Sequence, residues 1–151
     1  MKVTKSILTV LVSVIMIISM PVTVSASVDN GGTVAPTSGG LILYSSNHCS
    51  SGNKRIYINA MISASDTMAE IGFKNIKVQQ STSGSGGWTT YFSPSNQIIT
   101  DADSYALENF LISVPGGYYY RFELTNYAKE YGWFFPDSQS VTVTSNVVYV
   151  A

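Results

Sequence analysis

The chain has 151 residues, with eight Lys and Arg against nine Asp and Glu, and its formal net charge is −1. Hydrophobic residues make up 45% of it and charged residues only 11%, which excludes a disordered chain and, without a basic patch, a nucleic-acid-binding protein. The length fits one domain with a two-layer core.

Residues 1–26 have the pattern of a secretory signal peptide. Lys2 and Lys5 give a basic start, residues 7–20 are almost wholly apolar, and small residues lead up to Ala26. A membrane anchor is the alternative, but residues 7–20 are shorter than the roughly 20 apolar residues that a spanning helix needs. We therefore expect cleavage after Ala26, a secreted extracellular product, and no membrane contact after cleavage.

Residues 27–40 are rich in Gly, Ser, Thr and Pro and show no periodicity. This composition predicts a flexible leader in front of a β-sandwich domain at 41–151. Within that domain, residues 41–44 predict a first edge strand. The polar residues 45–53 that follow predict a loop.

The predicted loop holds His48 and Cys49, the chain's single His and single Cys. One cysteine excludes an intrachain disulfide. A Cys-His pair suggests a nucleophile or a metal site, but sequence neighbours in a loop do not converge on one substrate, and zinc needs three or four ligands. We therefore predict a loop thiol without catalytic role, no metal site and no cofactor.

The next two strands are predicted from alternating apolar and polar residues. Residues 66–70 connect them, with room for one helical turn. A Gly- and Ser-rich loop at 81–87 then closes a hairpin onto residues 88–92. The side chains expected to point inward are Ile56, Ile58, Ala60, Ile62, Ala64, Ile76 and Val78.

Residues 93–104 are irregular in sequence and contain two closely spaced acids, Asp101 and Asp103. A calcium loop is the functional interpretation of this pair. Calcium takes six to eight oxygen ligands, however, and no further acid follows at the spacing of a calcium loop. We interpret the two acids as turn and cap residues.

Residues 115–130 form the predicted central strand and the turn in front of it, where Pro and Gly at 115–117 favour a hairpin or a corner between sheets. The Tyr118 hydroxyl is expected to tie this turn to the strand. The side chains expected on the core face are Tyr118, Tyr120, Phe122 and Leu124, and those alternating in the preceding strand are Phe110, Ile112 and Val114. A final strand, bent at 145–146, is predicted from Val141, Val143, Val147 and Tyr149.

The spacing from Ile112 through the Pro115 turn to Tyr118 resembles the E-to-F corner of fibronectin type III domains, although Pro follows the apolar anchor by three residues instead of two. The segments 58–62, 86–88, 117–121 and 126–130 resemble an uncharacterised family (a domain of unknown function) of short secreted proteins of Gram-positive bacteria. The count of about seven predicted strands, with frequent turn signals and no long helix, predicts an all-β, Ig-like or fibronectin type III-like sandwich. The resemblances imply the same fold, a secreted protein and no assigned activity.

Aromatic residues off the predicted core face indicate a secreted binding or interaction module, because rings in loops stack on sugars and protein partners. The candidate ligand-binding residues are Trp133, Phe134, Phe135, Tyr131, Tyr127 and Trp88. The expected partner is a glycan or an apolar protein surface, and the oligomeric state stays open. In the alternative structural interpretation, Trp133 and Phe135 fill the end of the sandwich.

An enzyme is not expected, because no constellation for hydrolysis is present. Glu108, Glu123 and Glu130 form no motif that predicts a carboxylate pair, and no nucleophile-elbow motif occurs. A small extracellular hydrolase is therefore the weakest alternative. A bacteriocin-like or toxin-like secreted protein is the other one, suggested by size, export and aromatic content, although no basic amphipathic helix is present for membrane attack.

Overall fold

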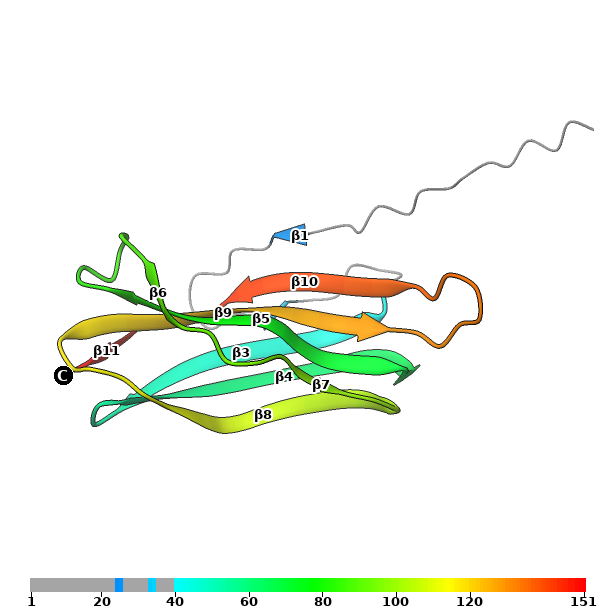
Figure 1. Ribbon diagram of the computed structural model, residues 1–151, viewed down its shortest axis with the longest axis horizontal. Helices are drawn as coiled ribbons and strands as arrows, with labels where there is room; N and C mark the ends of the chain where they lie inside the picture. Colours follow the sequence, from blue (N-terminus) through cyan, green and yellow to red (C-terminus); the bar gives the residue numbers. More distant parts are fainter. Residues whose placement is uncertain (1–23, 26–32, 35–39) are drawn as a thin grey trace, which may run out of the picture.

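The computed structural model describes residues 24–25, 33–34 and 40–151, and these form an all-β protein with two facing sheets of antiparallel strands (Figure 1). Apart from those two pairs of residues, the predicted signal peptide and most of the predicted leader lie outside the described residues. The described residues contain no helix, and hence none with the length and apolar character to cross a membrane.

Seven strands of at least four residues build the two sheets within the described part of the chain, in agreement with the predicted number. The smaller sheet holds, in spatial order, β3 (Ile42–Gly52), β4 (Arg55–Met68) and β8 (Ala102–Ser113). The larger sheet holds β10 (Ser138–Thr144), β9 (Tyr118–Lys129), β5 (Glu70–Ser81) and β6 (Thr89–Phe92). Shorter segments pair beside them: β1 (Val24–Ser25), β2 (Thr33–Val34), β7 (Gln97–Ile99) and β11 (Val148–Val150).

The core lies between the two sheets and follows the predicted period of two. Each side chain predicted to point inward from β4 and β5 is buried, as are Phe122 and Leu124 of β9. Phe122 is fully inaccessible and sits between Val78 of β5 and the start of the β10–β11 bend. The alternation therefore identified these strands correctly, because one face of each is covered by the other sheet.

The loop predicted at 45–53 is wrong, because β3 occupies most of it. β3 pairs with β4 from Ile42 to Gly52. Its inward positions are largely polar, with Ser45 and Asn47 both buried, so its period of two is hidden in the composition. Asn126 of the opposite sheet donates a hydrogen bond from Nδ2 to Ser45 Oγ at 3.0 Å, which compensates for part of the polar burial.

Cys49 is a core residue and not a loop thiol. Its exposure is 0%, whereas His48, the residue before it in β3, is exposed. Successive side chains of a strand point to opposite faces, so the two groups cannot converge on one ligand. Burial raises the pKa of the Cys49 thiol to about 12.

The corner before β9 is stabilised by Tyr120 and not, as predicted, by Tyr118. Tyr120 is fully buried and its hydroxyl donates a hydrogen bond to the carbonyl oxygen of Pro115 at 2.9 Å. Tyr118 is the first residue of β9 and pairs with Val150 at the rim of the sheet, where its ring is half-buried. Tyr120 lies two residues further along the strand, where its ring is fully buried and its hydroxyl still reaches the turn.

The last predicted strand is divided in two, and its second part has the opposite parity. Val147 and Tyr149 are exposed, whereas Val150 is buried. Ser145 still follows the inward parity of Val141 and Val143, and its Oγ accepts a hydrogen bond from the Phe122 backbone N–H at 3.0 Å. The alternation shifts by one after Ser145, before β11 begins at Val148.

Two further segments differ from the sequence-based expectation. The predicted connection at 66–70 belongs almost entirely to β4 and β5, with a single bend at Ala69 and no helical turn. In β8, Asn109 has a φ of 51° at a register shift. This bulge changes the parity of the strand, so that Leu107 is buried while Glu108 is exposed.

The N-terminus gives a first prediction. β1 pairs in parallel with β10 through Val24 and Val141, so cleavage after Ala26 removes β1 and leaves that edge of β10 unoccupied by it. We expect the exported protein to begin at Ser27, because the small residues before that bond suit signal peptidase. Intact-mass measurement and N-terminal sequencing of the culture supernatant check this. Protein found in the membrane fraction with residue 1 still attached would contradict it.

Candidate binding site

The candidate residues 131–135, which we call the aromatic loop, lie in the connection between β9 and β10. This connection projects past the end of both sheets, at the right of Figure 1. The rings are in solvent and do not fill the end of the sandwich. Their exposed fractions are 59% for Tyr131, 99% for Trp133, 86% for Phe134 and 95% for Phe135.

The base of the aromatic loop is closed by backbone contacts. The Glu130 N–H donates to the carbonyl oxygen of Asp137 at 2.9 Å. Above this bond, a Cβ at Gly132 would lie 3.1 Å from the Cα and Cβ atoms of Pro136. Gly132 thus allows the two sides of the loop to approach closely and form a narrow neck.

Phe135 adopts a backbone conformation that is unfavourable for an aromatic residue. Its φ is 57°, in the left-handed region, where an L-residue other than glycine loses about 1–2 kcal/mol. The ring is almost fully exposed, so contacts within the described chain do not offset this loss. Local strain of this kind, retained without a packing benefit, is typical of binding sites.

Tyr127 lies on the outer face of β9, near the base of the aromatic loop, and one face of its ring is already occupied. Lys74 Nζ lies 3.0 Å from the ring centroid, a cation–π contact. Burial, and then the nearby Glu70 carboxylate, raise the pKa of the Tyr127 hydroxyl. Burial is also the main cause that lowers the pKa of Lys74. One face of the Tyr127 ring is therefore used within the sheet surface beside the loop.

Trp88 lies far from the aromatic loop, so it does not share one site with the other candidate residues. It precedes Thr89, which pairs with Gln80, and Gln80 pairs with Tyr120 at the start of β9. The aromatic loop follows Lys129, the last residue of β9. At about 3.4 Å per residue, the nine steps from Tyr120 to Lys129 separate the two by roughly 30 Å. The Trp88 ring is instead covered by the Arg121 guanidinium, whose Cζ is 4.3 Å from its centroid.

The acids considered for catalysis or calcium binding lie on several elements, with Glu123 on β9, Glu108 and Asp103 on β8, and Asp101 just before β8. Glu123 forms an ion pair with Lys77 at 3.0 Å, Glu108 is exposed on β8, and Asp101 occupies a turn with a φ of 57°. In the part of the chain that the structure describes, no three His, Cys, Asp or Glu side chains are grouped so that they could hold a metal ion.

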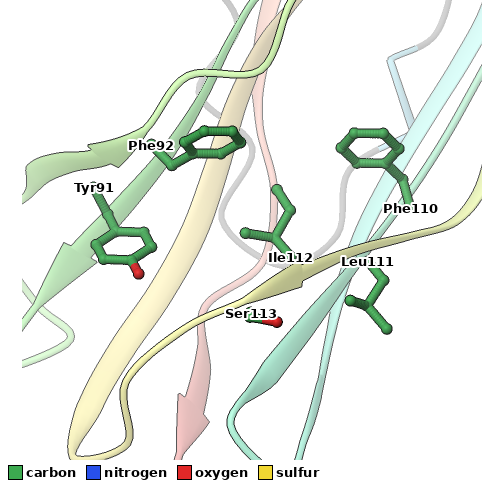
Figure 2. A pocket seen from close by; sticks show the side chains of 6 residues that line it. All are labelled: Tyr91, Phe92, Phe110, Leu111, Ile112 and Ser113. Carbon is green, nitrogen blue, oxygen red and sulfur yellow. The ribbon is translucent and has the colours of Figure 1, made fainter.

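The sequence did not reveal an apolar groove of about 560 Å³ between β6 and β8 (Figure 2). In Figure 2 the rings of Phe92 and Phe110 lie on opposite sides of it, with Ile112 between them. Its remaining lining residues are Tyr91, Leu111 and Ser113. The lining comes from two segments about twenty residues apart in the chain, so no local pattern indicates it.

A second cavity of about 480 Å³ adjoins this groove and shares Tyr91 and Ser113 with it. Lys54 and Arg55, at the turn between β3 and β4, line this cavity. The apolar groove therefore has a basic margin.

No protein-family model matches this chain, and no curated protein or solved structure shows significant similarity to it. The two antiparallel sheets place it in the class of all-β sandwich proteins. Its function is therefore inferred from the aromatic loop and the groove themselves.

Proposed function

We propose that this protein is a secreted, non-catalytic binding module of the Ig-like or fibronectin type III-like sandwich type, and that the aromatic loop is its binding element. The observation that carries the proposal is the nearly complete exposure of three consecutive aromatic side chains at 133–135. Contiguous exposed apolar surface on a secreted domain marks an interaction site, and buried Trp and Tyr side chains contribute most to the affinity of interfaces.

The neck of the loop supports this function because it fixes the position of the rings before a partner binds. The hydrogen bond between Glu130 and Asp137 and the contact between Gly132 and Pro136 restrict the backbone. A restricted loop loses less conformational entropy on binding, and more of the ring contact then appears as affinity. The partner that fits is neutral or apolar, such as a glycan or an apolar protein surface, and the rings act by stacking and burial.

An extracellular site of action is part of the proposal. It is supported by the signal-peptide pattern at 1–26 and by the resemblance to short secreted proteins of Gram-positive bacteria. Only 11% of the residues are charged, which is compatible with binding to an uncharged partner such as a neutral glycan.

The test compares mature protein with Trp133→Ser and with a matched control, Leu43→Ser, on glycan arrays, cell-wall fragments and intact cells. Leu43 is a large apolar side chain on β3, 46% exposed and outside the loop. We expect Trp133→Ser to weaken binding by at least about tenfold, as for a central aromatic anchor. The free energy of unfolding of Trp133→Ser should differ from that of the wild type by less than about 0.5 kcal/mol. Equal binding by the wild type and Trp133→Ser would contradict the proposal.

A further inference from the structure

The groove between β6 and β8 is an apolar site open to a partner. Both strands end their sheets on this side: β6 pairs only with β5, and β8 pairs only with β4. The volume of about 560 Å³ lies within the roughly 300–1,000 Å³ typical of ligand sites. Phe92 and Leu111 beside it are 48% and 46% exposed, so its walls are apolar and accessible.

The aromatic loop has the complementary shape and chemistry. It is convex and ends in exposed rings, whereas the groove is concave and lined by rings of Tyr91, Phe92 and Phe110. Aromatic side chains prefer offset or edge-to-face contacts with other rings. Insertion of Trp133 would bury apolar surface on both sides.

The charges beside the two surfaces are also complementary. Two acids flank the neck of the loop, Glu130 and Asp137, and two bases line the margin of the groove, Lys54 and Arg55. No salt bridge among the described residues uses any of these four side chains, since the two ion pairs there join Lys77 to Glu123 and Lys129 to Glu70. A loop seated in the groove would bring acids toward bases, which favours this orientation over others.

The loop and the groove lie toward opposite ends of the sandwich, so one molecule cannot fill its own groove. Phe92 pairs with Val78, which also pairs with Phe122. From Phe122 to Lys129, where the loop begins, β9 runs about 24 Å at roughly 3.4 Å per residue. In Figure 1, β6 lies toward the left and the β9–β10 connection at the right. The occupant that fits is therefore the loop of another copy.

We propose that this protein associates head to tail, with the aromatic loop of one molecule seated in the β6–β8 groove of the next. The inference rests on the proposed function, since it names a partner for the same binding element. Such a contact joins two different surfaces, so it leaves a free loop at one end and a free groove at the other, and it extends into open chains unless the geometry closes a ring. A single loop buries less than a standard interface of about 1,600 Å², so association is weak and depends on concentration.

The test is sedimentation velocity of mature protein at rising concentration, with variants of each surface. The wild type should show a weight-average sedimentation coefficient that rises beyond that of a dimer. Trp133→Ser, which alters the loop, and Phe92→Ser, which alters the groove, should each remain monomeric. Their mixture should form a one-to-one dimer and nothing larger, because one variant keeps an intact groove and the other an intact loop. A mixture that stays monomeric would overturn the proposal.

Charge reversal gives a second test on exposed residues that carry no core packing. Arg55→Glu and Asp137→Lys should each weaken association, and the double variant Arg55→Glu/Asp137→Lys should restore it, because every contact between its copies then joins the two reversed charges. If wild type stays monomeric at all concentrations yet binds glycans or cells through Trp133, self-association is overturned and the proposed function stands. If the loop supports neither self-association nor any other binding, both are overturned.

Discussion

Replacing Tyr120 by Ala is expected to lower the free energy of unfolding by about 3–5 kcal/mol, as for other fully buried aromatic side chains. Its ring is 0% exposed and packs edge-on against Tyr91 and Tyr118, at centroid distances of 6.1 and 6.4 Å. The conservative change Tyr120→Phe retains the ring and removes only the hydrogen bond to Pro115, so we expect a loss of about 1–2 kcal/mol.

Tyr118→Ala is the matched control, because it removes the same side chain from a half-buried position on the same strand. Its effect should be less than half that of Tyr120→Ala, since less area returns to water. Urea unfolding followed by circular dichroism measures all three variants. If Tyr118→Ala proves the more destabilising change, the corner is held by Tyr118 and the assignment to Tyr120 is wrong.

Cys49 is expected to react about a thousandfold more slowly with iodoacetamide in the native protein than in the unfolded chain, at the same pH. Burial raises the pKa of its thiol from 9.0 to about 12, so the thiolate, which is the reactive form, falls by about three powers of ten. Enclosure in the core slows the reaction further. Alkylation followed by mass spectrometry measures both rates, and rapid labelling of folded protein would contradict the core position of Cys49.

The same shift makes stability depend on alkaline pH. The folded state binds the thiol proton more tightly than the unfolded state, so the contribution of Cys49 is complete below pH 9.0 and is lost as pH rises toward about 12. Burial also raises the pKa of Tyr120, from 10.0 to about 12, which acts in the same direction. The variant Cys49→Ala should show a shallower loss of stability across this range than the wild type.

The strands that the sequence predicted correctly are those with apolar inward positions. β4 and β5 place Ile, Val and Ala against the opposite sheet, and the period of two survives in their sequences. The start of β3 was predicted within residues 41–44, but its continuation from Ser45 was missed because Ser45 and Asn47 occupy inward positions, where a hydrogen bond from Asn126 stabilises Ser45. Bulges were equally hidden: Asn75 and Asn109 adopt φ values of 52° and 51°, and each shifts a register that alternation alone would continue.

The candidate site was only partly accessible to sequence reasoning. The cluster at 131–135 stands out in composition, but its exposure depends on whether the connection extends or folds back over the core, and no periodicity decides that. Trp88 was grouped with the aromatic loop because a hairpin pattern in the sequence shows which strands pair. It does not show at which end of the sheet the hairpin lies. The groove was missed because Phe92 and Phe110, which line it, belong to different sheets and come close only when the two sheets pack.

The central claim, that the aromatic loop is exposed and available for binding, is tested most directly by the fluorescence of Trp133. The chain has two tryptophans, so Trp88→Phe leaves Trp133 as the single reporter. In dilute, monomeric protein we expect the emission of a fully hydrated indole and acrylamide quenching as efficient as in the unfolded chain. Emission should shift to shorter wavelength, with reduced quenching, when the loop is occupied by a partner or by a second copy. A blue-shifted and shielded Trp133 in the dilute monomer would contradict the claim.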